Sequence, residues 1–102
     1  MQAASPVQAR TIPGLLRAAA EAFGSASAVE DGAVRLSFAE LAESAESATR
    51  AFCARGLEPG DRVAIWAPNL WEWIVAALGL QSAGGVLVPL NTRLKGAAVW
   101  EL

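Results

Sequence analysis

Two short apolar runs lie on either side of a longer apolar segment in the second half of the chain. The runs, Val63 to Trp66 and Val86 to Leu90, contain β-branched residues and have the length of buried strands. The segment between them is long enough for a helix from about Leu70 to Ala83. The pattern therefore predicts a parallel βαβ unit, in which a crossover helix joins two strands with the usual right-handed connection.

Turn-forming residues mark both ends of this predicted helix. Pro68 cannot extend a strand, and Asn69 is a favourable N-cap residue. Gly84 and Gly85 provide the left-handed backbone conformation at which helices commonly end. Apolar residues extend most of the way round the helix, so other elements should cover it on more than one side.

The first part of the chain has the pattern of a helix followed by a β-hairpin. Thr11 is a candidate N-cap for a helix that can continue to about Phe23. Residues 28–30 and 34–36 have strand character and flank the segment from Asp31 to Ala33. The Asp-Gly pair in this segment favours the positive φ of a tight hairpin turn.

A longer amphipathic helix is predicted to follow the hairpin. Ser37 and Glu40 have capping-box spacing, in which each side chain can bond the backbone amide of the other residue. Gly56 suits the position after the helix end. We expect Cys53 to be a buried structural thiol rather than a catalytic one, because it falls on the apolar face. The residues of that face recur at helical spacing: Phe38, Leu41, Ala42, Ala45, Ala48, Thr49, Phe52 and Cys53.

The composition limits both the size and the chemistry of the protein. Its 102 residues suffice for one domain at most. A hydrophobic share of 54% with only 18% charged residues is apolar for a small free-standing domain. We therefore expect part of its surface to be covered by chain outside this sequence. A net charge of -2 without a basic run argues against nucleic-acid binding. One cysteine and no histidine leave little basis for a metal site.

Residues 1–10 lack the basic and apolar regions of a secretory signal and are predicted to be a disordered lead-in. Cytoplasmic residence is the default expectation. No charge occurs from Trp73 to Thr92, a length near that of a membrane-spanning helix. Gln81, Ser82 and the two glycines interrupt this window, which favours a helix end and a turn over a transmembrane segment.

The chain contains, in this order, LSFAEL at Leu36 to Leu41, GDRVAIWAPN at Gly60 to Asn69 and LQSAGGVLVPLN at Leu80 to Asn91. Together these motifs resemble the N-terminal part of the adenylate-forming enzymes, a superfamily that includes acyl-CoA synthetases, luciferases and nonribosomal peptide adenylation domains. LSFAEL at Leu36 to Leu41 resembles the first core motif, with Phe38 in place of the usual tyrosine. GDRVAIWAPN at Gly60 to Asn69 resembles the strand and turn that follow. LQSAGGVLVPLN at Leu80 to Asn91 resembles the second core motif. Asn91 is more typical of an acyl-CoA synthetase than of a peptide-synthetase domain.

The resemblance implies both a fold class and a reaction. The fold would be α/β, the incomplete N-terminal part of the adenylate-forming fold, with a β-hairpin, an amphipathic helix and the parallel βαβ unit. Residues 11–102 would form a partial AMP-binding domain that is truncated before the phosphate loop. Family members activate a carboxylic acid with ATP and Mg²⁺ to an acyl-adenylate and pyrophosphate. They then transfer the acyl group to a thiol, typically that of coenzyme A.

The resemblance transfers no catalytic, cofactor-binding or metal-binding residue to this chain. The phosphate loop, the acidic residue that binds ribose and the catalytic lysine of a mobile C-terminal domain lie further along the family sequence. Lys95 does not correspond to that lysine. The segment alone is therefore expected to be an inactive scaffold that binds no ATP, Mg²⁺ or coenzyme A. Its expected partner is the remainder of the domain, and a carboxylic or fatty acid would be the substrate of the whole enzyme.

Two other interpretations remain open from the residues themselves. The chain could be a non-catalytic interaction or complementation module whose exposed apolar helix and strand faces bind a partner. It could also be a small membrane-associated protein that uses the segment from Trp73 to Thr92. Detergent-dependent extraction would support the second of these interpretations.

Overall fold

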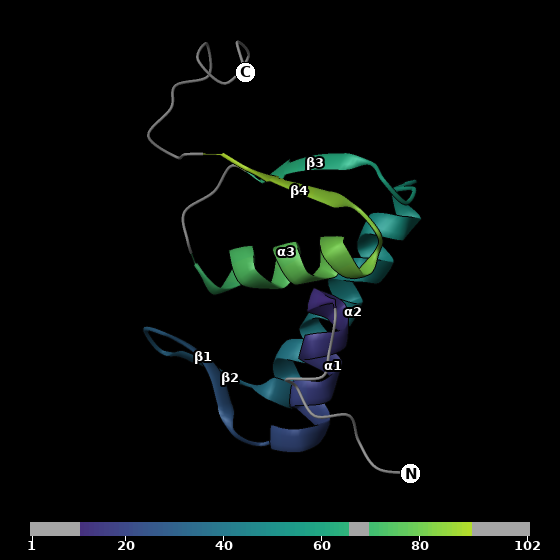
Figure 1. Cartoon of the computed structure of the whole chain (residues 1–102). Coiled ribbons are helices and arrows are strands. Elements are labelled where there is room, and N and C mark those ends of the chain that lie inside the picture. Colours follow the sequence, from purple (N-terminus) through teal and green to yellow (C-terminus); the bar gives the residue numbers. More distant parts are fainter. Residues whose placement is uncertain (1–10, 66–69, 91–102) are drawn as a thin grey trace.

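The computed structural model describes residues 11–65 and 70–90. The elements are α1 (Ile12–Phe23), β1 (Ser27–Asp31), β2 (Val34–Ser37), α2 (Phe38–Ala54), β3 (Arg62–Ile65), α3 (Trp71–Ser82) and β4 (Val86–Pro89). Within these ranges they form two separate two-stranded sheets, β1–β2 and β3–β4 (Figure 1). The α/β class and the order of helix, hairpin, long helix and βαβ unit are confirmed. The lead-in predicted for residues 1–10 lies outside the described residues.

The hairpin pairs β1 and β2 as antiparallel strands around a tight turn. Asp31 pairs with Val34, so Gly32 and Ala33 form the loop. Gly32 has a φ of 59°, a conformation that residues with a side chain rarely adopt. The turn predicted from the Asp-Gly pair is thus confirmed, with the glycine supplying the positive φ.

Helix α2 begins with the predicted capping box. The Glu40 amide donates to Ser37 Oγ at 3.1 Å, and the Ser37 amide donates to Glu40 Oε1 at 2.9 Å. These bonds satisfy amides that have no partner inside the helix. The hydrogen bond from the Ser37 backbone, and then that of its side chain, hold the pKa of Glu40 below its ordinary value. At the other end, Gly56 has the positive φ of 94° expected after a helix.

The lowered pKa of Glu40 makes the capping box pH-dependent. Its ionised carboxylate stabilises the fold above the ordinary glutamate pKa of 4.5, and this contribution disappears as the pH falls through the lowered value. We therefore expect Glu40→Gln to lower the midpoint of urea unfolding at pH 7, with a smaller difference from the parent in acid. Ser37→Ala should cost about 1 kcal/mol at pH 7. Glu43→Gln, on the exposed side of α2, is the matched control. An equal effect of both glutamine variants at every pH would contradict the capping role.

Strands β3 and β4 are parallel and are joined by α3. Residues 62–65 pair one to one with residues 86–89, without a shift in register. Gly84 has a φ of 86°, and the amide of Gly85 donates to the Leu80 carbonyl at 3.0 Å, which closes the end of α3. The predicted strand, crossover helix and parallel strand are confirmed.

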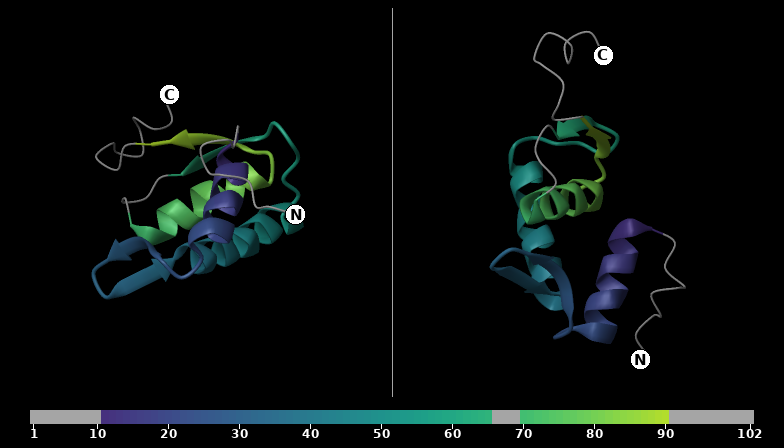
Figure 2. Two further views of the ribbon diagram at one scale, coloured as in Figure 1. Left: turned by 60° about the horizontal axis from the view of Figure 1, so that its bottom comes forward. Right: turned by 90° about the vertical axis from the view of Figure 1, so that its left-hand side faces the viewer.

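Helix α3 is the central layer of the described structure. It lies between the β3–β4 sheet on one side and α2, α1 and the hairpin on the other (Figures 1 and 2). The prediction that this helix is covered on more than one side is confirmed. The buried apolar core is small and comes from all three helices: Ala18, Ala19, Leu41, Ala45, Ala77 and Leu80.

The predicted burial of Cys53 is wrong, because its side chain is exposed. Helix α1 lies antiparallel to α2. At one end of the pair the rings of Phe23 and Phe38 are 5.8 Å apart, and at the other Pro13 and Thr49 line the same hollow. Since α1 has 12 residues and α2 has 17, the last turn of α2 extends past the start of α1. Cys53 lies on this turn, which α1 does not cover, whereas the neighbouring Phe52 is half-buried beside α3.

Within the described ranges, none of the helices is both long enough and apolar enough to cross a membrane. The uncharged window that begins at Trp73 is divided between α3, the turn at Gly84 and β4. Its last two residues, 91 and 92, lie outside the described part of the chain.

Candidate functional site

The carboxyl ends of β3 and β4 lie side by side because the two strands are parallel. Ile65 pairs with Pro89, and the Leu90 amide donates to the Ile65 carbonyl at 3.0 Å. Ligands of open α/β sheets bind outside this edge of the sheet. The segments that continue from it, 66–69 and 91–102, lie outside the described residues. The described structure therefore includes the edge of the sheet and the helices α3 and α2 that pack beneath it.

The N-terminus of α3 is capped by a residue from the hairpin. Leu70 occupies the N-cap position, and its side chain makes no capping bond. Instead, the Trp71 amide donates to Asp31 Oδ2 at 3.0 Å, across 40 positions of sequence. A carboxylate at this end also interacts favourably with the helix dipole. The cap predicted at Asn69 falls outside the described residues. Asp31 was missed because its partner is distant in sequence, and a carboxylate in a hairpin is ordinarily a turn residue.

Helices α2 and α3 cross closely at Gly79. A Cβ atom at this position would lie 2.5 Å from the Cβ of Ala48 and 3.0 Å from the carbonyl oxygen of Ala45. Thr49 Oγ1 lies 2.9 Å from the carbonyl oxygens of both Ala45 and Gly79, so its hydroxyl proton bridges the two helices. This crossing fixes α3, and with it the parallel strands, against α2.

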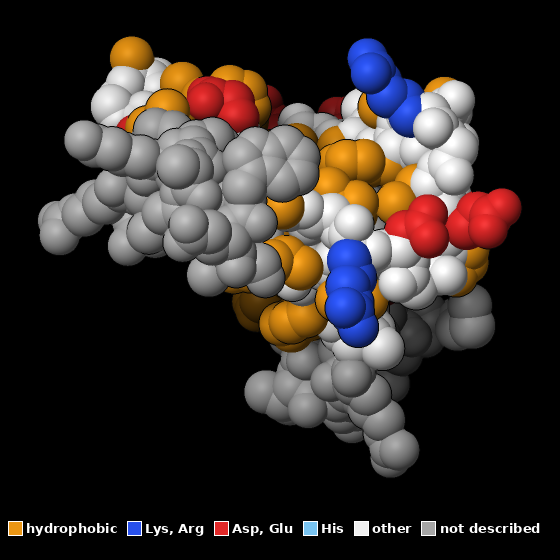
Figure 3. Space-filling view, turned by 90° about the horizontal axis from the view of Figure 1, so that it is seen from above, with side chains coloured by type: hydrophobic (Ala, Val, Ile, Leu, Met, Phe, Trp, Pro, Cys, Tyr) orange, Lys and Arg blue, Asp and Glu red, His pale blue; other side chains and the backbone are white. Residues whose placement is uncertain are grey.

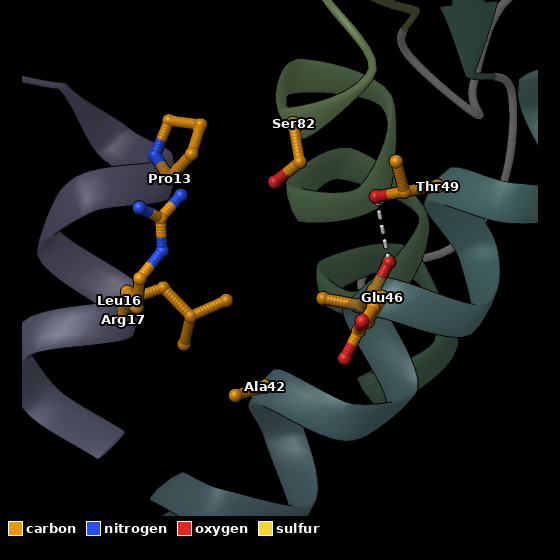
Figure 4. Close-up of a pocket in the computed structure, with 8 residues that line it drawn as sticks. Pro13, Leu16, Arg17, Ala42, Glu46, Thr49 and Ser82 are labelled. Atoms are coloured by element: carbon orange, nitrogen blue, oxygen red, sulfur yellow. Dashed lines mark hydrogen bonds between the residues drawn. The ribbon is translucent and has the colours of Figure 1, made fainter. Parts of the chain in front are cut away.

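A hollow of about 450 Å³ opens where α1, α2 and α3 meet. Figure 4 shows Arg17 on the α1 wall, with its guanidinium turned toward Pro13, and Glu46 on the α2 wall opposite. Both residues are exposed, so their charges are solvated rather than held in a desolvated active site. The remaining wall residues are Pro13, Leu16, Ala42, Ala45, Thr49 and Ser82.

A second, shallower groove of about 380 Å³ runs between α2 and α3. Its walls are apolar apart from Arg55 and Glu72. Binding sites for small molecules usually add a few convergent polar groups to such a surface, whereas Arg55 and Glu72 are both exposed to solvent. The groove is therefore a packing surface by its chemistry. Its apolar walls consist of Ala48, Ala51, Phe52, Trp71, Val75 and Ala76.

These features do not assemble a catalytic group among residues 11–65 and 70–90. Those ranges contain no cluster of three His, Cys, Asp or Glu side chains able to hold a metal ion. Glu40, whose pKa is lowered, is engaged in the capping box of α2. What the arrangement can do is hold one edge of a parallel sheet in place. The expectation that the chain carries no catalytic, cofactor-binding or metal-binding residue stays a prediction.

The described elements define a structural unit of an α/β domain. In this unit α2 packs against α3, the helix that joins the parallel strands β3 and β4. The chain belongs to the family of AMP-binding enzymes, whose model matches residues 16–101. This range includes all three motifs between Leu36 and Asn91. The resemblance to adenylate-forming enzymes is thereby confirmed.

Similar curated proteins are acyl-CoA ligases. The chain is 46% identical over 86 residues to the 3-[(3aS,4S,7aS)-7a-methyl-1,5-dioxo-octahydro-1H-inden-4-yl]propanoyl:CoA ligase of Rhodococcus jostii. It is 36% identical over 89 residues to the mitochondrial medium-chain acyl-CoA ligase ACSF2 of Danio rerio. The two matches each cover 84% of this chain, but only 17% and 14% of the respective ligases. The chain thus spans a small share of the length of these relatives.

Solved structures share the fold of this chain. The N-terminal domain of FACL13 from Mycobacterium tuberculosis matches with a TM-score of 0.84 and 31% identity, over 89% of this chain and 24% of that one. The N-terminal subdomain of Klebsiella oxytoca NpsA matches with a TM-score of 0.87 over 91% of this chain and 24% of that one. At 24% identity, the similarity to NpsA concerns the fold alone.

Proposed function

We propose that this chain is a scaffold segment of an ATP-dependent acyl-CoA ligase. The whole enzyme would activate a carboxylic acid with ATP and Mg²⁺, releasing pyrophosphate and forming an acyl-adenylate. The thiol of coenzyme A would then displace AMP to give the thioester. The observation that carries the proposal is the 46% identity to the Rhodococcus jostii ligase over 86 residues.

The contribution of this segment to such an enzyme is positional. Asp31 and the capping box fix the starts of α3 and α2, and the crossing at Gly79 fixes the two helices to each other. Together they hold the carboxyl edge of β3 and β4, where ligands bind in open α/β sheets. We propose that residues 11–102 belong to one AMP-binding domain and that the phosphate-binding and catalytic groups come from the rest of that domain. We further propose fatty or other carboxylic acids as substrates and the cytoplasm as the location.

A chimeric enzyme tests this proposal. The 86 matched residues of the Rhodococcus jostii ligase are replaced by those of this chain, and coenzyme A ester formation from its substrate is measured with ATP and Mg²⁺. We expect activity to be retained, because the exchanged segment supports the site without supplying reacting groups. A chimera that folds normally by circular dichroism but forms no thioester would overturn the proposal.

The isolated chain gives a complementary result. Calorimetric titration with ATP and Mg²⁺ should show no saturable binding, and incubation with carboxylic acids should release no pyrophosphate, because the chain is proposed to be scaffold. Acid-dependent pyrophosphate release by the pure chain would show that the chain itself is catalytic and would overturn its assignment as scaffold.

A further inference from the structure

The two halves of α3 are held in the fold by different means. The second half contains the buried residues of this helix, Ala77, Gly79 and Leu80. Gly79 meets α2 at the close crossing, and the Gly85 amide closes the helix through its bond to the Leu80 carbonyl. The C-terminal half is therefore fixed by packing. In the first half, by contrast, Leu70 and Ile74 are 45% and 36% exposed.

The Asp31 carboxylate attaches the first turn of α3 to the hairpin. Asp31 is half-buried and pairs with Val34 across the tight turn. Its Oδ2 accepts from the Trp71 amide at 3.0 Å, one of the amides without a partner inside the helix. The hairpin turn and the start of α3 lie on the same side of the molecule (Figures 1 and 2). Because the hairpin also packs on α2, this bond ties the start of α3 to the layer below it.

The start of α3 lies at the edge of the sheet where ligands of open α/β folds bind. The helix follows β3 and precedes β4, so it begins at the carboxyl ends of the parallel strands. Figure 3 looks onto the sheet side, where charged side chains stand at separate points around a hydrophobic area. Any contribution of this side to ligand binding is therefore expected from the placement of its elements rather than from a cluster of charges.

We propose that Asp31 is a positioning residue of the ligase, which holds the first turn of α3 in the place that ligand binding at the carboxyl edge requires. This inference rests on the proposed function and adds to it a residue that acts through α3 rather than on a reacting atom. Without the bond from Trp71, a smaller fraction of the molecules has the binding-competent arrangement. A smaller competent fraction raises KM, while kcat of the bound enzyme changes little.

The test uses the Rhodococcus jostii chimera, whose exchanged segment includes both Asp31 and Trp71. Asp31→Ala should raise the KM for ATP or for the carboxylic acid about fivefold, with kcat within about twofold of the parent. Asp31→Asn keeps an acceptor oxygen and should restore KM to within about twofold. Glu30→Ala is the matched control, because Glu30 is exposed on the same strand and its carboxylate accepts from Ser27 instead.

A second variant separates positioning by the hairpin from capping alone. Leu70 has the extended N-cap backbone, with φ -103° and ψ 172°, so Leu70→Ser supplies a local cap. In Asp31→Ala/Leu70→Ser the helix end is capped but no longer attached to the hairpin. We expect this double variant to regain thermal stability and to keep the raised KM, and it serves as the test if Asp31→Ala alone fails to fold. A parental KM in the double variant would overturn the positioning role.

Hydrogen exchange of backbone amides in the 102-residue chain, followed by NMR, gives a readout without enzyme activity. Asp31→Ala should speed exchange of the Trp71 amide at least about tenfold and leave that of Gly85 unchanged, because packing fixes the far end of α3. Equal acceleration at the two amides would mean general destabilisation and would count against a local role of Asp31.

The outcomes separate this inference from the proposed function. A parent chimera that folds but forms no thioester removes the ligase assignment, and with it the positioning role. An active chimera in which Asp31→Ala changes neither KM refutes the positioning role alone. A fall in kcat with both KM values unchanged would indicate loss of folded enzyme and would refute it as well.

Discussion

Leu80→Ala should lower the free energy of unfolding by about 2–5 kcal/mol. Leu80 is 0% exposed and lies in α3, the layer between α2 and the parallel sheet. A Cβ added at Gly85 would collide with the Leu80 side chain, so the backbone of Gly85 packs directly against this side chain. Truncation would remove buried apolar contacts and leave a cavity that the surrounding backbone cannot fill. A domain of this size is stabilised by only about 5–15 kcal/mol, so the loss is a large share of the total.

Urea unfolding followed by circular dichroism measures this effect. Leu70→Ala is the matched control, because Leu70 is 45% exposed at the start of the same helix and should cost less than about 1 kcal/mol. Equal costs for the two leucine variants would contradict the central position of Leu80. The parent chain is included at several protein concentrations, so that association through its apolar surfaces is separated from unfolding.

Gly79→Ala should destabilise the protein by about 1–3 kcal/mol, although alanine is the better helix former. The added Cβ would lie 2.5 Å from the Cβ of Ala48 and within 3.0–3.1 Å of backbone atoms of Ala45 and Thr49. Backbone atoms of α2 cannot move aside as a flexible side chain can, so the two helices would have to separate. Separation would also lengthen the bond from the Thr49 hydroxyl to the Gly79 carbonyl.

The sign of the change distinguishes packing from helix propensity. If propensity alone acted, Gly79→Ala would stabilise the protein by about 1 kcal/mol. Combining it with Ala48→Gly removes the nearest clashing atom, so the double variant should be more stable than the sum of the two single changes predicts. Additive effects in urea unfolding would show that the two residues do not meet at the crossing.

The exposed Cys53 side chain shows that an apolar helical pattern does not by itself predict which residues are buried. The apolar face of α2 has helical spacing to its end, which is a local property of the sequence. Whether that face is buried depends on how far α1 extends along α2, and α1 is five residues shorter, with 12 residues against 17. The amphipathic pattern therefore predicted the helix correctly and the burial of Cys53 incorrectly.

The interhelical contacts of α3 could not be predicted for a related reason. Gly79 was one small residue in an apolar helix, and Asp31 was one acid in a hairpin turn. Their functions, a close crossing with α2 and a cap for α3, exist only once distant segments have been brought together. The absence of a catalytic constellation was also expected from the residues themselves, since the sequence has no histidine, and that expectation stays a prediction.

The sequence by itself determined the local elements and their order. The Ser37–Glu40 capping box, the Gly32 turn and the glycine at the end of α3 are set by bonds and dihedral angles within a few residues. Only the tertiary structure decided which faces are covered, since burial depends on the length and placement of neighbours. It paired β3 with β4, placed the Asp31 carboxylate at the start of α3 and left Val86 of β4 exposed. Contacts between distant segments carry no local signature, because they depend on the chain as a whole.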